Sequence, residues 1–379
     1  MIKILYFYPE NPTIVNQGNN ARAFALLQYF KCRQMEVDYV GIASKSFLEK
    51  NIDLIKESDV IKNGFLLKRD KRISKTLAYL FSYAIPNKLK GRIRDLDRTR
   101  YGHKAQFSSI LKKNNYDFII ISYAYWAELI KNNPNIKKSK IIIDTHDFLT
   151  SQFQNQKRFR LGNYFQKEIE LLNLFDKIFV ISSDENYLFS QFVNSEVITI
   201  PHAITPKFHL KLNTKKYDLV YVASDNEHNV KSAKWFFEKV YPLLDKFISI
   251  CVVGKINQHV PDLDNIVKFD FIEDLDQIYS ESKVAICPML TGTGLKIKVV
   301  EALSFGLPVV CNPRGIDGLI NKTNNGCLVA EDAISFSKHI GQLLTDNNFY
   351  EQQRNLSKDY FINYLSVESV YLELDKVFK

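Results

Sequence analysis

The sequence predicts an α/β protein with two doubly wound domains, each built on a parallel sheet. Short apolar runs alternate with helical patterns along the whole chain, which is typical of this class. The apolar runs are nearly continuous, as strands buried on both faces require. The chain has 379 residues, which is too long for one compact core. Its 46% hydrophobic and 25% charged residues exclude a disordered or fibrous protein.

The first half of the chain is expected to form one domain, residues 1–205. Helical patterns connect its apolar runs, for example at Ala21 to Cys32 and Phe165 to Phe175. The runs predicted as strands are residues 2–8, 37–42, 117–122, 140–144, 177–182 and 196–201.

The second half restarts the same alternation and is expected to form a domain of residues 206–355. The polar stretch from Thr205 to Asp218 is the natural linker. Residues 356–379 are predicted to be helical, because an apolar stripe runs from Val367 to Val377. The runs predicted as strands are residues 217–224, 248–254, 266–272, 283–289, 307–312 and 326–330.

Cysteine usage and hydropathy predict a cytoplasmic protein. The five cysteines form no C-x-x-C pair and several lie in apolar runs, as buried reduced thiols do. The N-terminal residues show no cleavage site, and the apolar run Leu77 to Ile85 is far shorter than the ~20 residues that span a bilayer.

Positive charge is concentrated between Lys68 and Arg100. This segment has 11 Lys or Arg against 3 Asp, a balance of +8 out of the net +9 of the chain. Aromatic and aliphatic residues are interleaved with the basic ones, a composition that suits an anionic membrane surface. Nucleic acid could attract the same charge, and a solvated helical face is the plain alternative.

The segment from Pro288 to Val310, PMLTGTGLKIKVVEALSFGLPVV, predicts a site for a phosphate-bearing ligand. A predicted strand ends here, a loop with Gly292 and Gly294 follows, and a helix is expected to begin near Leu295. At 100° per residue, Gly294, Lys298 and Glu301 share one face and Lys296 points away. The distance from Gly294 to Glu301, about 10 Å along the axis, suits a diphosphate at one end and a ribose at the other. A surface Lys–Glu pair is the plain alternative.

Two common nucleotide fingerprints are missing. Neither domain has G-x-G-x-x-G after its first predicted strand, and no G-x-x-x-x-G-K-[ST] loop occurs. Hydride transfer and ATP hydrolysis are therefore disfavoured.

Four segments resemble, in order, the retaining nucleotide-sugar glycosyltransferases of family 4, also called glycosyltransferase group 1. GTGLKIKVVEALSFGLPVV followed by NPRGIDGL resembles their C-terminal signature. IIIDTHDFLTSQ, SDNEHNVKSAKWFFEKVYPLL and QGNNARAFALLQYF resemble other segments of the family. Residues 45–112 match nothing in it.

The resemblance implies the GT-B fold, two Rossmann-like domains facing a cleft, with residues 356–379 packing back on the first domain. It implies a nucleotide-sugar donor on the second domain and an acceptor on the first. His146 and Lys298 would serve catalysis, and Glu301 would bind the ribose. The other donor-binding residues would be Gly18, Ser224, Asn229, Gly292, Thr293, Gly294 and Leu295, with further diphosphate or acceptor contacts from Arg22, Asp147, His202, Lys231 and Arg314.

The sequence departs from the family pattern at two places. Thr293 stands where the family often has a second glutamate, eight positions before Glu301. The region from Ser224 to Asn229 replaces the family's usual Arg and Lys. Lys298 is therefore the first candidate to balance the charge of the leaving diphosphate, and Lys231 or Arg314 is the second.

His146 follows a predicted strand, where ligands bind, and we favour a functional role over a structural one at a domain seam. No partner ligands at metal-site spacing accompany it, so we expect neither a metal nor a cofactor. The histidines expected at surface or loop positions are His103, His209, His228, His259 and His339.

The predicted reaction moves a sugar from a nucleotide-diphosphate donor to a saccharide or polyprenyl-linked acceptor, with retention. Bacterial surface polysaccharide or glycolipid synthesis is the expected setting, in the cytoplasm or peripherally on the inner membrane face, without nucleic acid. Two alternatives are a sugar-nucleotide 2-epimerase on the same fold and a non-catalytic protein that binds membranes or polyanions.

Overall fold

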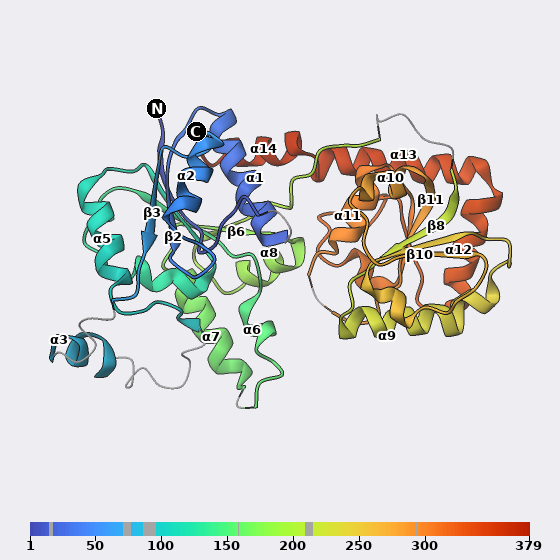
Figure 1. Ribbon diagram of the computed structural model, residues 1–379, viewed down its shortest axis with the longest axis horizontal. Coiled ribbons are helices and arrows are strands. Elements are labelled where there is room, and N and C mark those ends of the chain that lie inside the picture. The colour runs from blue at the N-terminus through green and yellow to red at the C-terminus, as the bar shows by residue number, and fades with distance from the viewer. Residues whose placement is uncertain (15–17, 71–76, 86–95, 158, 209–214, 293) are drawn as a thin grey trace. The chain divides into compact units, whose positions relative to one another are not determined.

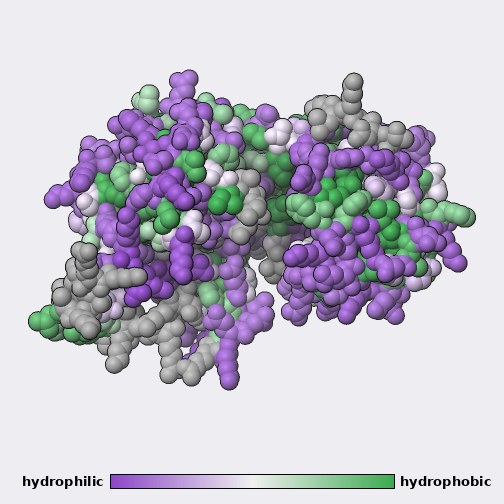
Figure 2. All heavy atoms as spheres, viewed as in Figure 1, coloured by the Kyte–Doolittle hydropathy of each residue, from purple (hydrophilic) through white to green (hydrophobic). Residues whose placement is uncertain are grey.

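The computed structural model describes residues 1–14, 18–70, 77–85, 96–157, 159–208, 215–292 and 294–379. The chain folds as two compact units (Figure 1). The first unit consists of Met1–Ile181 and Glu185–Thr199, and the second of Ser182–Asp184 and Ile200–Lys379. Residues 209–214 of the predicted linker lie outside the described residues. Hydrophilic residues cover most of the visible surface (Figure 2).

The first unit contains a seven-stranded sheet in the order β3-β2-β1-β4-β5-β6-β7. Every neighbouring pair is parallel, which confirms the predicted class. The strands are β1 Lys3–Phe7, β2 Glu36–Ile42, β3 Asn63–Leu67, β4 Phe118–Ser122, β5 Lys140–Asp144, β6 Lys177–Val180 and β7 Glu196–Thr199. The edge strand β3 was not predicted, because only the second half of its short apolar run is buried.

The helices of the first unit connect its strands, as parallel pairing requires. They are α1 Gly18–Cys32, α2 Glu49–Glu57, α3 Leu77–Tyr79, α5 His103–Lys113, α6 Leu149–Gln152, α7 Leu161–Leu172 and α8 Ser183–Ser190, with the π-helical turn η1 Leu80–Ala84 and the 3-10 helix η3 Ala124–Leu129. The predicted helices at 21–32 and 165–175 correspond to α1 and α7, which both begin earlier.

The second unit contains a six-stranded parallel sheet in the order β10-β9-β8-β11-β12-β13. Alternate residues of one strand belong to different cores: Leu219 and Tyr221 lie in one cluster, and Val220 lies in the other. The sheet is therefore covered on both faces. Its strands are β8 Tyr217–Val222, β9 Ile250–Val253, β10 Ile266–Phe269, β11 Ser282–Cys287, β12 Val309–Cys311 and β13 Cys327–Val329.

The helices of the second unit include two in the C-terminal stretch that was predicted as one. The predicted domain boundary after residue 355 falls inside α13, and the packing of 356–379 on the first domain stays a prediction. The helices are α9 Glu227–Trp235, α10 Leu275–Ser280, α11 Ile297–Ser304, α12 Ala333–Thr345, α13 Asn347–Tyr364 and α14 Val367–Asp375, with the π-helical η4 Phe236–Val240 and the 3-10 helices η5 Tyr241–Leu243, η6 Lys255–His259 and η7 Pro313–Ile316. Within the described ranges, no helix has the length and apolar character needed to cross a membrane.

The strand order of each sheet reverses at its first strand. β1 lies between β2 and β4, and β8 lies between β9 and β11. In doubly wound sheets, ligands bind beyond the carboxyl ends of the strands at such a switch point. The loops that follow β1 and β4 in the first unit, and β8 and β11 in the second, are therefore where sites are expected.

Candidate functional site

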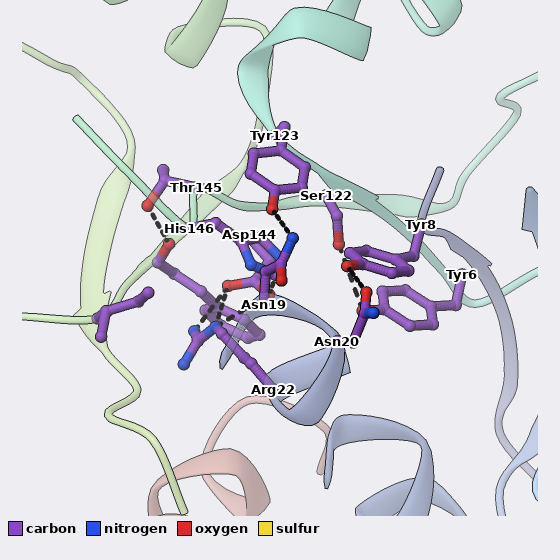
Figure 3. A network of polar contacts seen from close by, with 12 residues as sticks. Tyr6, Tyr8, Asn19, Asn20, Arg22, Ser122, Tyr123, Asp144, Thr145 and His146 are labelled. Atoms are coloured by element: carbon purple, nitrogen blue, oxygen red, sulfur yellow. Dashed lines mark hydrogen bonds and ion pairs between the residues drawn. The ribbon is translucent and has the colours of Figure 1, made fainter. Parts of the chain in front are cut away.

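The first unit gathers a buried polar network at the carboxyl ends of β1, β4 and β5 (Figure 3). β5 ends at Asp144, and His146 follows two residues later. β4 ends at Ser122 and is followed by Tyr123. Helix α1, which comes after β1, carries Arg22 to the same place. The predicted residues Arg22 and His146, which follow β1 and β5, are thus brought together at one edge of the sheet.

Asp144, which the sequence reading did not single out, joins Arg22 to His146. Arg22 Nη2 lies 2.6 Å from Asp144 Oδ1, and His146 Nε2 lies 3.0 Å from Asp144 Oδ2. The side chains of all three are almost completely buried, at 6%, 1% and 2% exposure for Arg22, Asp144 and His146. Burial alone would raise the pKa of Asp144, but Arg22 and His146 outweigh it and hold this pKa well below its usual range.

The backbone at His146 and Tyr123 lies in the left-handed region, with φ of 60° and 65°. Such conformations are costly for residues with a side chain and persist where the surroundings enforce them, often at functional sites. Here the two rings stack, with centroids 4.3 Å apart and planes at 19°. His146 Nδ1 is buried without a hydrogen-bond partner among the described residues. The hydrogen-bonding capacity of this nitrogen is therefore unused in the described part of the structure.

Helix α1 also fixes two tyrosines beside His146. Asn19 Nδ2 donates to Tyr123 Oη at 3.0 Å, and Tyr8 Oη donates to Asn20 Oδ1 at 2.5 Å. The ring of Tyr8 stacks on His146 at 5.8 Å between centroids. The start of α1 therefore positions the aromatic rings as well as Arg22.

Several partly or fully buried carboxyl groups follow β5 in the chain. Burial raises the pKa of Asp147 and of Glu168, and it raises the pKa of Glu185 on α8 to about 7. Glu168 accepts hydrogen bonds from the backbone N–H of Leu149 and Thr150, at 2.8 and 2.7 Å, and so anchors the start of α6. Asp147 lies partly buried beside this anchor. In the part of the chain that the structure describes, no group of three or more His, Cys, Asp or Glu could hold a metal ion.

In the second unit, the start of α9 holds two predicted residues in place. The Asn226 side chain caps the helix by accepting from the Asn229 N–H at 2.9 Å. Asn229 Nδ2 donates to the Ser224 carbonyl oxygen at 2.9 Å. Lys298 Nζ, which comes from α11, donates to Asn229 Oδ1 at 3.0 Å. Ser224, Asn229 and Lys298 therefore meet at the β8/β11 switch point.

Lys298 and Glu301 lie on one side of α11, one turn apart, as predicted. The Lys298 ammonium lies 5.6 Å from the centre of the Tyr221 ring, and burial lowers the pKa of this lysine. Glu301 Oε2 accepts from Tyr279 Oη at 3.2 Å, and burial raises the pKa of this glutamate.

The backbone of the glycine loop differs from the predicted helix. Gly292 and Gly294 have φ of 96° and 76°, which is incompatible with a right-handed helix, and α11 begins only at Ile297. The prediction that Lys296 points away is therefore wrong. Lys296 is buried and its Nζ donates to the Gly294 carbonyl oxygen at 2.6 Å. Thr293 lies outside the described residues.

The remaining predicted residues take less central places. Gly18 is the exposed first residue of α1, and Leu295 packs partly buried against the second unit's core. Lys231 is exposed on α9, and His202 is partly buried. Arg314 is 56% exposed and pairs with Asp317 at 3.2 Å rather than with the Lys298 cluster.

His228 is exposed, as predicted, and it also borders the glycine loop. Its Nδ1 lies 2.9 Å from Thr291 Oγ1, and a Cβ at Gly292 would lie 3.5 Å from its ring. The ring is exposed and comes from the first turn of α9. The position of His228 directly before the capped Asn229 is the signal that could have indicated this role.

The second unit also matches a known family. Residues 216–346, from the start of β8 to the end of α12, match the family described as Glycosyl transferases group 1. The match is confined to this part of the second unit. The Asn229–Lys298 cluster, the described part of the glycine loop and Glu301 all lie inside the matched residues.

Over its whole length, the chain also resembles a protein of similar size and several solved structures. It is 22% identical over 377 residues to an uncharacterized 44.6 kDa protein in the cps region of Klebsiella pneumoniae, covering 90% of both chains. Sucrose-phosphate synthase from Thermosynechococcus elongatus has a TM-score of 0.69 and 14% identity, covering 100% of this chain and 98% of its own. Anabaena HepE in complex with UDP and glucose has a TM-score of 0.67 and 12% identity, covering 100% and 99%. These likenesses show that the fold is GT-B, as predicted.

Proposed function

We propose that this protein is a glycosyltransferase that moves a hexosyl group from a nucleotide diphosphate to a saccharide or polyprenyl-linked acceptor. The observation that carries the proposal is the partly buried ammonium of Lys298, held by Asn229 beside a glycine loop inside the residues that match the group 1 family. UDP is the first nucleotide to test, because HepE binds UDP and glucose on the same fold. The cps-region relative supports surface polysaccharide synthesis as the setting.

The chemistry requires stabilisation of the negative charge that develops on the departing diphosphate. Lys298 and the N–H groups of the glycine loop would supply it without a metal ion, and His228 would add a donor from the opposite side of the loop. Glu301 would accept hydrogen bonds from the ribose hydroxyls. His146 would contact the transferred sugar through its unpartnered Nδ1, on the first unit, where the acceptor would also bind.

The reaction is proposed to retain the anomeric configuration and to need no metal. NMR of the product's anomeric proton checks retention, and an unchanged rate in EDTA checks metal independence. Formation of an isomerised donor sugar without any acceptor would instead identify a 2-epimerase. The enzyme would work in the cytoplasm, peripherally at the membrane that carries its acceptor.

Replacing Lys298 by Ala tests the central assignment. Turnover should fall by about 100- to 1000-fold, as when an oxyanion-binding donor is removed, while the melting temperature changes little. Lys234→Ala is the matched control, because Lys234 is an exposed lysine on the neighbouring α9 and has no predicted role in the site. Turnover near that of the wild type would remove Lys298 from the site.

Replacing Glu301 by Ala tests the ribose contact separately. The loss of charged hydrogen bonds, worth about 1.5–3 kcal/mol each, should weaken UDP binding by at least about ten-fold in calorimetry. Glu238→Ala, an exposed glutamate on η4, should bind UDP like the wild type. Unchanged affinity in Glu301→Ala would contradict the ribose assignment.

A further inference from the structure

The short helical segment Leu77–Ile85, formed by α3 and η1, has two apolar sides, and one of them attaches it to the first unit. The rings of Tyr79 and Tyr83 lie against Tyr101, with centroids 5.2 and 5.8 Å away. Tyr83 Oη donates to the Thr99 carbonyl oxygen at 3.3 Å. These contacts fix which side of the segment faces the unit. Figure 1 shows α3 projecting away from the sheet.

The opposite side of the segment exposes large apolar side chains. Leu77 is 72% exposed and Phe81 67%, with Leu80 and Ile85 at 42% and 41%. At about 100° per residue these four positions fall within an arc of about 140°, so they form one face. Figure 2 shows hydrophobic side chains on the outside of the molecule where α3 lies, beside the uncertain residues drawn in grey. A contiguous exposed apolar face of this kind marks an interaction surface.

The charge around this apolar face indicates its partner. The segment 68–100 carries +8 of the chain's net +9, whereas Leu77–Ile85 contains no charged residue. Residues 71–76 and 86–95 of the segment lie outside the described residues, but in the sequence basic residues precede and follow Leu77–Ile85. An uncharged apolar helix flanked by cations fits a bilayer, whose anionic headgroups lie above an apolar interior.

We propose that the face formed by Leu77, Leu80, Phe81 and Ile85 inserts into the headgroup boundary of an anionic phospholipid bilayer. Nucleic acid would leave the leucine and isoleucine side chains uncovered. A second copy of the chain would need about 800 Å² per partner, whereas a nine-residue helix is only about 13 Å long. This inference deepens the proposed function, since it brings the first unit to the membrane that would present a lipid-linked acceptor.

The test is cosedimentation of the full chain with vesicles, without donor or acceptor. The wild type should bind phosphatidylglycerol-containing vesicles more strongly than phosphatidylcholine alone, and more weakly at high salt. The double variant Leu77→Gln, Phe81→Gln should bind the anionic vesicles at least about ten-fold more weakly. Phe271→Gln is the matched control, because Phe271 is 80% exposed but belongs to the second unit. It should bind like the wild type.

Three results would overturn the proposal: equal vesicle binding by the double variant and the wild type, preference of the wild type for duplex DNA over anionic vesicles, or a wild-type dimer that the double variant abolishes. UDP affinity, measured on the same preparations, should not change in the double variant. Lys298→Ala should lose UDP affinity and keep vesicle binding. A failure of the membrane proposal is thereby separated from a failure of the proposed function.

Discussion

At the scale of single residues, the site in the first unit depends on the buried carboxylate of Asp144. Asp144→Asn would leave the Arg22 guanidinium buried without its counter-charge, which typically costs about 3–5 kcal/mol. Because the pKa of Asp144 is lowered in the folded protein, its stabilising effect is present above its unfolded pKa of about 4. That effect is lost as the pH falls through the folded pKa. The variant should therefore differ most from the wild type at neutral pH.

Hydrogen exchange of β4 and β5 in urea measures this loss within the first unit. The difference between Asp144→Asn and the wild type should shrink as the pH is lowered below about 4. Asp59→Asn is the control, since Asp59 pairs with Lys31 at 3.2 Å but is 88% exposed. Its effect should stay below about 1 kcal/mol. Equal losses of stability in the two variants at neutral pH would show that the buried Arg22–Asp144 pair stabilises the first unit no more than the exposed pair does.

Glu185 has the opposite dependence on pH. Burial raises its folded pKa to about 7, above the unfolded value of about 4.3. Stability is thus full below the unfolded value and is lost as the pH rises through about 7. Glu185→Gln, which never ionises, should stabilise the first unit by on the order of 2 kcal/mol at pH 8 and change little below about pH 4. The same exchange experiment checks this, and an unchanged stability at pH 8 would contradict it.

Some site residues could be predicted because their positions follow from local sequence. His146 comes directly after a strand, and Lys298 and Glu301 lie one turn apart in a short helix. Asp144 could not be assigned, because its partner Arg22 lies 122 residues away and meets it only once β1, β4 and β5 are paired. The contact of His228 with Thr291 likewise depends on the pairing of β8 with β11.

At the scale of elements, the cap of α9 supports both the helix and the site. Asn226→Ala removes the side chain that accepts from the Asn229 N–H, which should cost about 1 kcal/mol of stability. It should also weaken UDP binding several-fold, because Asn229 holds the Lys298 ammonium. Urea unfolding and calorimetry measure the two effects on one preparation.

Asp332→Ala provides the matched comparison in the same unit. Asp332 caps α12 by accepting from the Ser335 N–H at 2.7 Å, and its helix contributes none of the predicted donor-binding residues. A similar loss of stability is expected, with UDP affinity unchanged. If both variants weakened UDP binding equally, the effect of Asn226→Ala would reflect general loosening and not the position of Asn229.

Element boundaries were less predictable than the elements themselves. The twelve predicted strands all occur because continuous apolar runs are hard to place anywhere but in a doubly covered sheet. The start of α11 was placed two residues early, because positive φ at Gly294 cannot be inferred from a pattern of side chains. β3, at the edge of its sheet, lacks the two-sided burial that makes central strands recognisable.

At the scale of the whole molecule, the two units share one kind of parallel sheet but carry different side chains at their switch points. The β1/β4 switch point carries a buried ion pair, a histidine and stacked tyrosines, whereas the β8/β11 switch point carries a lysine, an amide and a glycine loop. In the proposed function the second set would bind the diphosphate and the ribose, and the first would bind the transferred sugar and its acceptor. Under the proposed function, nucleotide binding and turnover should therefore respond to different variants.

His146→Ala and Lys298→Ala together test this division. UDP lacks the transferred sugar that would contact His146, so His146→Ala should bind UDP within about two-fold of the wild type while turnover falls by about 100-fold or more. Lys298→Ala should lose both, because its ammonium would pair with the diphosphate before and during transfer. Calorimetry with UDP and initial rates with a UDP-sugar give the two quantities, and His339→Ala on α12 should change neither. Loss of UDP binding in His146→Ala, or its retention in Lys298→Ala, would contradict the assignment of nucleotide binding to the second unit.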